Sequence, residues 1–387
     1  AQGPGPPLPP PTPAPRNVMG HPRLRTEHQP SIRPDSQIQI GALPNLASIL
    51  PDPGGWRWNL LQLLDGTRNT ADVLQTMKTA HPDVPAAHIG RLLTDLARAG
   101  HLHDSVTSSP PADMAPDTVQ RRLRNAEYLE MVDRRPDRTG WDIQAALARA
   151  VVTIVGIGGT GSVAAAALAA AGIGRLVLVD HDQVEESNLN RQILYTASDI
   201  GRPKIDAAWD RLKERHPDLD VVTIPEQITL RAQFARLMRG CDLLILAADQ
   251  PDGLRLTANR AAIESGCAWV DPGYHGPVIS TTLYVPADGR GCWECLRHAD
   301  AVAHGLPGIR ANVPPAALPR TTGHPVTAVT AGLAGTWAAH AAITHLTGTR
   351  EFTPATVYRH SLIAPADQPL APLTYPRNPH CPSCTTS

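Results

Sequence analysis

The sequence predicts an α/β protein in which a Rossmann-like domain, built on a parallel or mixed sheet, follows a small α+β domain. Three observations support this prediction. Residues 151–182 read as strand, glycine turn, helix and strand. Residues 56–99 show helical spacing of apolar side chains, and two C-x-x-C pairs lie far apart in the second half of the chain. Alternating strands and helices of this kind form sheets covered by helices.

The glycine turn is the feature around which the second domain is organised. A β-branched run, Val151–Val155, leads into four glycines and an alanine-rich helix. A second apolar strand then delivers Asp180, about 20 residues after the turn, where a ribose hydroxyl would lie. Glycines let the backbone approach phosphate oxygens, and a helix start offers free N–H groups to an anion. We expect a nucleotide here; the alternative is a tight strand–helix turn without a ligand. The glycines are Gly156, Gly158, Gly159 and Gly161.

Composition excludes several classes of protein. The 387 residues are enough for two or three domains. A formal net charge of −1 gives no general attraction to nucleic acid or to an anionic membrane. No apolar run approaches the ~20 residues of a membrane span, and no signal peptide is evident. We therefore expect a cytoplasmic protein that binds neither nucleic acid nor membrane.

The first 105 residues divide into a proline-rich arm and a small module. Residues 1–18 are too rich in proline to fold alone, so we expect a disordered or polyproline arm, with an inert tail favoured over a proline-motif ligand. In the module, residues 19–105, Thr70 can cap a helix, and His101–His103 can begin a wing. The module's strand and helices are expected at 37–40, 56–64, 70–77 and 85–99.

This order of elements is typical of a winged helix, a fold that often binds DNA. The third helix carries only Arg91 and Arg98 against Asp95, which is a poor electrostatic footprint for DNA. The chain from residue 63 to Leu102 instead resembles the PqqD-like domain, the recognition element of pathways that modify ribosomal peptides. The matching residues are the run L-L-D-G-T-R at 63–68, Leu92, Leu93, Leu96 and Gly100.

The resemblance to the PqqD-like domain implies a peptide partner. Such a module would capture the leader of a precursor peptide as an added strand, with main-chain hydrogen bonds supplying affinity. The alternative is a packing or dimerisation domain without a ligand. A linker rich in Ser and Pro, residues 106–118, follows the module, and the sheet domain is expected over 119–387.

Three ordered motifs follow in the sheet domain: V-G-x-G-G-x-G-S, then V-D-x-D-x-V-x-x-S-N-L-N-R-Q, then I-G-x-P-K. Over residues 119–386 the chain resembles the ThiF/MoeB superfamily of ATP-dependent adenylating enzymes, which are akin to ubiquitin-activating enzymes. The resemblance implies ATP and Mg²⁺ as cofactors. It assigns nucleotide contacts to the four glycines and to Asp180, Asp182, Asn188 and Gln192.

The chemistry of adenylation explains the charged residues of these motifs. A carboxylate must be brought against the anionic α-phosphate, which requires fixed cations and a metal-binding acid. The resemblance makes Arg191 and Lys204 the cations and Asp249 the ligand of Mg²⁺. Lys204 is one of only three lysines in the chain. The motif departs from the family pattern at Gln250, where asparagine is usual. It departs again at Arg255 and Asn259, which lie one residue later than in the family pattern. We therefore give these two residues little weight as site residues.

An R-x-x-R pair, Arg121 and Arg124, precedes the first strand of the sheet domain. In the family this pair sends an arginine into the ATP site of the partner subunit. We expect Arg124 to act in trans, which implies a homodimer. The family usually has an aromatic residue where this chain has Arg122. The alternative is a charged helix without such a role.

Six cysteines are present, and four of them form the C-x-x-C pairs. Four thiolates close a tetrahedral structural Zn²⁺ site, which would tie the C-terminal tail to the sheet domain. A redox dithiol is the alternative. Cys241 and Cys267 flank predicted strands, and we expect them to be buried core thiols. The expected ligands are Cys292, Cys295, Cys381 and Cys384.

No cysteine lies between Cys295 and Cys381. In the family the crossover segment, here about 296–325, covers the active site and often carries a cysteine that receives the activated substrate. A thioester or persulfide at that place is therefore excluded. Tyr274 and His275 follow another predicted strand, where they could contact the acyl substrate or transfer protons; a structural turn is the alternative.

These observations lead us to expect an enzyme that adenylates a carboxylate of a ribosomally made precursor peptide, with amide, imide or ring formation to follow. Two alternatives stay open. One is adenylation of the C-terminus of a ubiquitin-like sulfur-carrier protein, and the other is a non-catalytic scaffold that binds a leader peptide. The retained residues Asp180, Arg191, Lys204 and Asp249 argue against the scaffold.

Overall fold

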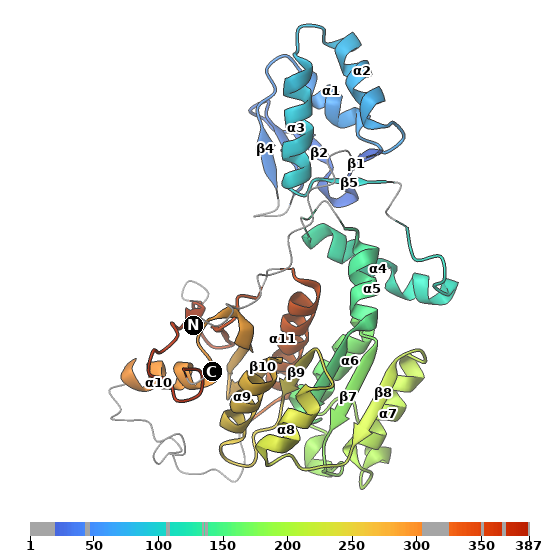
Figure 1. Cartoon of the computed structure of the whole chain (residues 1–387). Helices are drawn as coiled ribbons and strands as arrows, with labels where there is room; N and C mark the ends of the chain where they lie inside the picture. The colour runs from blue at the N-terminus through green and yellow to red at the C-terminus, as the bar shows by residue number, and fades with distance from the viewer. Residues whose placement is uncertain are drawn as a thin grey trace, which may run out of the picture. The chain divides into compact units, whose positions relative to one another are not determined.

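The computed structural model describes residues 20–42, 47–105, 109–133, 135, 138–303, 325–349, 352–365 and 369–385. The chain divides into two compact units, Ala1–Gln144 and Ala145–Ser387 (Figure 1). The expected proline-rich arm and residues 304–324 of the crossover segment lie outside the described residues. The predicted division at 19, 106 and 119 stays a prediction.

The first unit is an α+β structure. Its strands form a three-stranded antiparallel sheet in the order β2-β3-β4 and a separate β1–β5 pair. The strands are β1 (Pro22–Leu24), β2 (Pro30–Ile32), β3 (Ile38–Ile40), β4 (Ser48–Leu50) and β5 (Leu102–Asp104), and a 3-10 turn spans Thr26–His28. The helices are α1 (Trp56–Leu63), α2 (Thr70–Ala80), α3 (Ala86–Arg98) and α4 (Pro116–Val132).

The spacing of apolar residues explains the core of this unit. In α3 the buried side chains recur three or four positions apart, so they form one stripe that faces the core. In β3, Ile38 and Ile40 point to the same side and are buried. The predicted cap of α2 was wrong by one residue: the Asn69 side chain accepts a hydrogen bond from the Asp72 N–H, and Thr70 is the first helical residue.

Helix α4 is bound to this unit by polar contacts. His103 in β5 donates to the Glu130 carboxylate, and the Arg25 guanidinium donates to the Glu130 carbonyl oxygen. Burial is the largest influence on Glu130 and opposes its ionisation, but the contacts with His103, Arg25 and the Gly140 N–H together lower the pKa of the carboxyl. Because α4 begins at Pro116, the last residues of the expected linker are helical.

The second unit is built on one mixed sheet of eight strands. Their order is β13-β12-β11-β10-β9-β6-β7-β8, with parallel pairing from β10 to β8 and antiparallel pairing from β10 to β13. The parallel strands are β6 (Val151–Val155), β7 (Arg175–Val179), β8 (Asp220–Ile224), β9 (Leu243–Leu246) and β10 (Ala268–His275). The others are β11 (Val278–Tyr284), β12 (Thr356–Ser361) and β13 (Leu373–Thr374).

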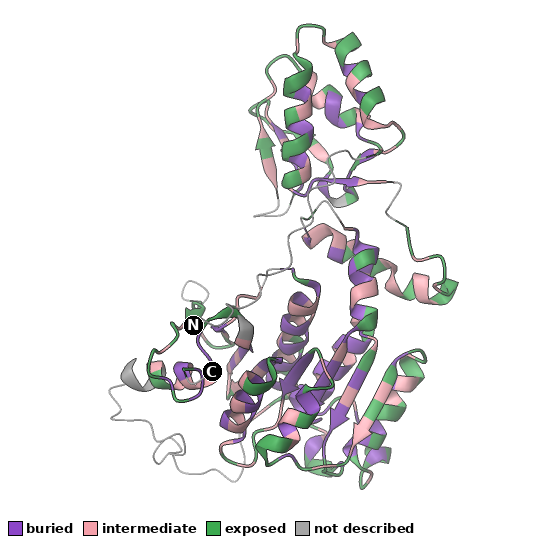
Figure 2. Ribbon diagram, viewed as in Figure 1, coloured by how far each residue is buried: buried purple, intermediate pink, exposed green. Residues whose placement is uncertain are grey.

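Strand β6 pairs with both β7 and β9, so the chain turns to opposite sides of β6 before and after β8. Such a switch point leaves a crevice at the carboxyl ends of the strands, where α/β proteins bind ligands. All four residues of β9 are buried, as expected for a strand covered on both faces (Figure 2).

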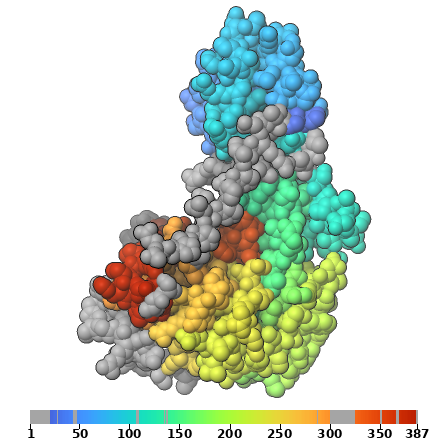
Figure 3. Space-filling model, in the orientation of Figure 1, coloured from blue at the N-terminus to red at the C-terminus, as the bar shows by residue number. Residues whose placement is uncertain are grey.

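Helices cover both faces of the sheet. In the space-filling view, α8 and α9 form much of the visible face of the second unit (Figure 3). Small residues allow α11 to lie directly on α6: a Cβ at Gly335 would come within 2.4 Å of the Thr160 carbonyl oxygen. The helices are α5 (Gly140–Arg149, across the unit boundary), α6 (Gly159–Ala171), α7 (Lys204–Arg215), α8 (Arg231–Met238), α9 (Leu254–Ser265), α10 (Trp293–Ala303) and α11 (Ala328–Thr347). Among the described residues, none of these helices has the length and apolar character needed to cross a bilayer.

Candidate functional site

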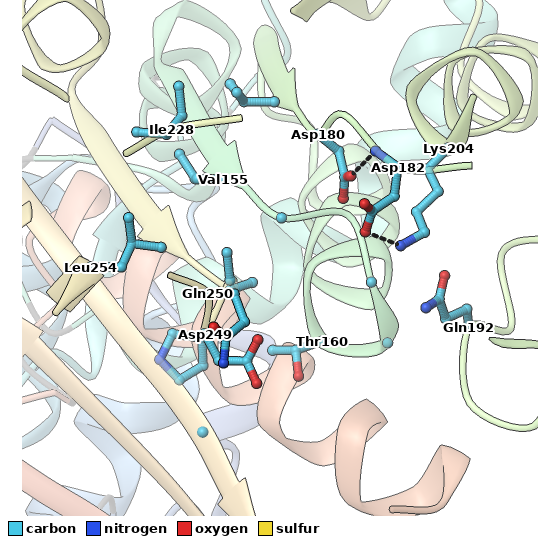
Figure 4. Close-up of a pocket in the computed structure, with 18 of the residues that line it drawn as sticks. Val155, Thr160, Asp180, Asp182, Gln192, Lys204, Ile228, Asp249, Gln250 and Leu254 are labelled. Carbon is cyan, nitrogen blue, oxygen red and sulfur yellow. Dashed lines mark hydrogen bonds and ion pairs between the residues drawn. The ribbon is translucent and has the colours of Figure 1, made fainter. Parts of the chain in front are cut away.

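A pocket of about 660 Å³ opens at the switch point of the sheet. Its wall comes from the residues that follow β6, β7, β8, β9 and the end of β10, together with Val326 before α11 (Figure 4). Most of the predicted site residues meet here. Those that line the pocket are Gly156, Gly158, Gly159, Asp180, Asp182, Arg191, Gln192, Lys204, Asp249, Tyr274 and His275.

The glycine turn joins β6 to α6 as predicted. Gly156 has a φ of +90°, and a Cβ there would lie 2.8 Å from the Ala248 nitrogen, so a side chain does not fit. A Cβ at Gly161 would lie 1.8 Å from the Gly156 carbonyl oxygen. Gly161 does not line the pocket. Its missing side chain allows the first turn of α6 to lie directly against the Gly156 carbonyl. The turn is braced by Tyr195, whose buried hydroxyl donates to the Ile157 carbonyl at 2.7 Å.

Two carboxylates from the loop after β7 have different environments. Asp180 is buried, and its two oxygens accept from the backbone N–H groups of Ile157 (2.6 Å) and Asp182 (2.8 Å). A carboxylate has about four acceptor positions, so Asp180 retains capacity for a ligand hydroxyl. The Asp182 side chain is half exposed, and it accepts from the Lys204 ammonium at 2.8 Å (Figure 4).

Lys204 is therefore a buried cation that faces the pocket but already has a carboxylate partner. Its side chain is 8% exposed, so its ammonium needs a negative group nearby. A phosphate that enters the pocket would compete with Asp182 for this ammonium. Arg191 is held in a similar way: one guanidinium nitrogen donates to the Ser187 carbonyl and to the Asn190 side chain, both at 2.9 Å.

Gln192 provides a test of whether the pocket suits a polar ligand. The side chain is only 3% exposed, and its Oε1 has no hydrogen-bond partner in the part of the chain that the structure describes. Leaving such a group unpaired costs about 1–3 kcal/mol. A hydrogen bond from a ligand would recover that cost, so this residue fits a polar ligand such as a nucleotide. Asn188, in contrast, does not line the pocket; its side chain accepts from the Glu185 N–H at 3.2 Å and holds the turn.

The other wall carries Asp249 and Tyr274. Asp249 follows β9 and is exposed in the pocket, where an acid could hold a divalent cation. Burial raises the pKa of Tyr274, nearby Arg191 opposes the shift, and the Asp249 charge adds to it. The phenol therefore stays protonated near neutral pH and can donate a hydrogen bond.

Sequence reasoning gave Arg255 little weight, yet it lines the pocket. Its guanidinium donates to the Asp271 carboxylate at 2.8 Å, and this contact raises the pKa of Arg255. Its place in the first turn of α9, directed at the same edge of the sheet as Asp249, is the signal that could have identified it. Asn259 lies elsewhere: its side chain donates to Cys292 Sγ at 3.6 Å and accepts from the Trp293 N–H at 3.0 Å.

Arg124 lies in the first unit, on α4. Its side chain is 88% exposed and pairs with Glu127 at 2.9 Å. Surface pairs of this kind contribute about 0–1 kcal/mol. Its action in a partner subunit stays a prediction.

The four predicted cysteine ligands form one buried cluster, with all four sulfurs within 4.8 Å of one another. Sulfur–sulfur distances are 3.9 Å for Cys292–Cys295, 3.6 Å for Cys292–Cys381 and 3.5 Å for Cys295–Cys384. A tetrahedral zinc with sulfurs at about 2.3 Å would separate them by about 3.8 Å. The Asn378 N–H also points at Cys295 Sγ, at 3.3 Å, which favours a thiolate. The cluster therefore fits a structural zinc with no open coordination position.

Known proteins resemble both the sheet unit and the whole fold. The *Escherichia coli* sulfur carrier protein ThiS adenylyltransferase is 34% identical over 168 residues, which is 41% of this chain and 63% of that protein. The *E. coli* molybdopterin-synthase adenylyltransferase is 34% identical over 161 residues, 40% of this chain and 62% of that protein. This chain thus spans less than two thirds of the length of these relatives.

Two solved structures share the fold over nearly the whole chain. The crystal structure of *E. coli* MccB with ATP has a TM-score of 0.73 at 19% identity, covering 94% of this chain and 99% of MccB. A crystal structure of PaaA has a TM-score of 0.67 at 22% identity, covering 91% and 99%. A model of the ThiF family matches residues 133–383, which is more than half of the sequence. The chain belongs to the ThiF family.

Proposed function

We propose that this protein uses Mg·ATP to adenylate a carboxylate on a ribosomally made precursor peptide. The pocket supports the ATP part of this proposal, because a volume of about 660 Å³ is lined by a glycine turn, by the cations Arg191, Lys204 and Arg255, and by acids that include Asp180, Asp182 and Asp249. Family membership and the adenylyltransferase relatives support the reaction type. Such a reaction belongs in the cytoplasm, where ATP and new peptides are available.

The peptide part of the proposal rests on how much of this chain each similar protein covers. The fold of MccB accounts for 94% of this chain, whereas the ThiS adenylyltransferase match accounts for 41%. The ThiF family model begins at residue 133, so it leaves most of the first unit, Ala1–Gln144, unmatched. MccB has been crystallised with MccA as well as with ATP. A peptide substrate gives the first unit a role.

The reaction requires charge balance at the α-phosphate. A carboxylate oxygen of the peptide forms a bond to the α-phosphorus, and the bond to the β-phosphate oxygen breaks, releasing pyrophosphate. In the proposal Arg191 and Lys204 stabilise the developing charge. Asp249 would hold Mg²⁺, which polarises the phosphate when bound. Asp180 would accept from the ribose, and Gln192 would pair with a polar group of the nucleotide.

A partner subunit completes this site in the proposal. Arg124, exposed on α4, would reach the α-phosphate of the other protomer, so the active form would be a homodimer. Tyr274 would donate to the incoming carboxylate, since its phenol lies close enough to Arg191 and Asp249 to sense both charges.

The first unit would capture the leader peptide. Within the described residues, the edge strands of its three-stranded sheet are β2 and β4, each paired with β3 alone, and both carry exposed apolar side chains, with Ile32 62% and Ile49 50% exposed. An extended peptide can add to such an edge as a further strand, with pockets for alternate side chains. Since the sequence has no cysteine between Cys295 and Cys381, the adenylate would collapse to an amide, an imide or a ring.

A second candidate is adenylation of a ubiquitin-like sulfur-carrier protein. The specific observation in its favour is sequence identity: 34% with the ThiS adenylyltransferase and 39% over 129 residues with the *Thermus thermophilus* sulfur carrier protein adenylyltransferase, against 19% with MccB.

The deciding experiment measures pyrophosphate release from Mg·ATP by the full chain, with candidate precursor peptides and with a carrier protein that ends in Gly-Gly. We expect release with a peptide and a large rise in its KM in Ile49→Asp or Ile32→Asp. Release with the carrier alone would favour the second candidate. No pyrophosphate release with either substrate, with peptide binding retained, would indicate a non-catalytic scaffold.

A further inference from the structure

Two cysteines outside the zinc-type cluster lie in contact. Cys241 comes just before β9 and Cys267 just before β10. These strands are parallel neighbours, with Leu243 opposite Ala268, so their entry ends lie side by side. As a result the two sulfurs are 3.8 Å apart although 26 residues separate them in the chain. The sequence predicted that both are buried core thiols, and it did not predict the contact between them.

The surroundings of the pair differ from those of a metal site. Within the described residues, groups of three or more potential metal ligands occur at the four clustered cysteines and at Asp180–Asp182, and neither group includes Cys241 or Cys267. Two sulfurs alone do not complete a tetrahedral zinc site. The pair also does not line the pocket. Two thiols in contact that neither bind a metal nor line the pocket can still be oxidised to a disulfide.

The two thiols are not equivalent. Cys267 is buried, whereas Cys241 is only partly buried and is the more accessible to a small oxidant. The hydrogen bond from the Cys267 thiol lowers the pKa of Cys241, with help from Thr153, and the same contact raises the pKa of Cys267. A thiol with a lowered pKa in contact with a second thiol that can resolve it is the arrangement that favours a disulfide over further oxidation.

We propose that Cys241 and Cys267 form a reversible disulfide when the protein meets hydrogen peroxide. The Cys241 thiolate attacks the peroxide, the O–O bond breaks, and a sulfenic acid forms with release of hydroxide. The Cys267 thiol then attacks this sulfur, an S–S bond forms, and water leaves. The two sulfurs are oxidised by one electron each, and the two peroxide oxygens are reduced by one electron each. A small-molecule dithiol then reduces the S–S bond to the two thiols and is itself oxidised to a disulfide.

The disulfide would join the entry ends of β9 and β10. The opposite ends of these strands carry Asp249 and Tyr274, which line the pocket. The modification site therefore lies at the amino ends of the same two strands whose carboxyl ends contribute to the pocket. Its formation is independent of the proposed substrate.

The test treats the 387-residue chain, loaded with zinc, with hydrogen peroxide, blocks free thiols with iodoacetamide and maps peptides without reduction. We expect a peptide linked through Cys241 and Cys267, lighter by two hydrogen atoms than the sum of its parts and lost after dithiothreitol. The four clustered cysteines should keep their zinc, measured with a chromophoric chelator. In Cys267→Ser, Cys241 should instead proceed to sulfinic acid.

A second measurement needs no variant. Phenylarsine oxide bridges two adjacent thiols, so it should protect Cys241 and Cys267 of the native protein from iodoacetamide. Full alkylation of both after the arsenical, or peroxide oxidation of folded protein that yields sulfinic acid on Cys241 without the linked peptide, would overturn the proposal. A linked peptide that joins either residue to the clustered cysteines would do the same.

Discussion

The pocket and the cysteine cluster lie in the same unit but are built on opposite principles. The pocket brings together charged side chains that already have protein partners yet remain accessible: Asp182 is 52% exposed, and its partner Lys204 lines the cavity. In the cluster, all four sulfurs are buried. An open site can exchange its partners for a ligand, whereas a closed site has its coordination complete.

This difference predicts how each site responds to change. A substitution in the pocket should alter catalysis and leave the fold intact, because few packing contacts are lost. A substitution in the cluster should alter the fold first, because Cys381 and Cys384 lie against Cys292 and Cys295, and a bound zinc would tie the C-terminal tail to this part of the sheet unit. The following predictions test that separation, from the largest expected effect to the smallest.

Removing zinc should unfold much of the second unit. Structural zinc in small domains contributes ~10 kcal/mol or more of apparent binding free energy, most of it expressed as folding. We expect Cys381→Ser, or chelation at raised temperature, to release zinc and lower the melting temperature strongly. Metal content and differential scanning calorimetry measure both effects. Cys241→Ser is the control and should keep its zinc; a Cys381→Ser protein with unchanged zinc and melting temperature would contradict a structural site.

Asp249→Ala should abolish adenylation while the fold stays intact. Loss of a group that stabilises the transition state costs about 10²–10³ in rate, and loss of the metal ligand should cost at least that. Pyrophosphate release at saturating ATP measures the effect, with zinc content and melting temperature as checks. Asp252→Ala removes an exposed acid from the same loop that does not line the pocket, and it should be active. Full activity of Asp249→Ala would sink the proposed function.

Two glycines of α11 should respond in opposite directions. A Cβ at Gly335 would meet the Thr160 carbonyl at 2.4 Å and Val163 at 2.9 Å, so Gly335→Ala should destabilise the unit by about 1–3 kcal/mol. A Cβ at Gly332 meets nothing within 4 Å, so Gly332→Ala should stabilise the helix by roughly 0.5–1 kcal/mol. Denaturant unfolding measures both. Equal effects would mean that α11 does not lie against α6 at this point.

The smallest expected effect concerns the competition for Lys204. Asp182→Asn removes the carboxylate that holds the ammonium, so the phosphates of ATP should bind more easily. We expect the KM for ATP to decrease, by less than about fivefold, because the pair is half exposed. Asp210→Asn breaks an exposed pair with Arg202 away from the pocket and serves as the control. A rise in KM in Asp182→Asn would mean that Asp182 itself contacts the nucleotide.

Several features of the fold and site were predictable because they depend on local backbone requirements. The glycine turn, the acid after β7 and the order of strands and helices follow from periodicity and from positions that exclude a Cβ, such as Gly156. The four zinc-type ligands followed from ligand spacing alone. The error at the α2 cap arose because Asn69 and Thr70 are both good capping residues, and only backbone geometry distinguishes them.

The sequence by itself determined the family, the mixed α/β architecture and the cysteines that cluster. Only the tertiary structure decided which side chains lie in contact and which of them face the pocket. The Lys204–Asp182 pair, the buried Gln192 amide, the place of Arg255 in the pocket and the Cys241–Cys267 contact all depend on which strands lie side by side. Strand order is set by packing across the whole sheet, so no local pattern encodes these distances.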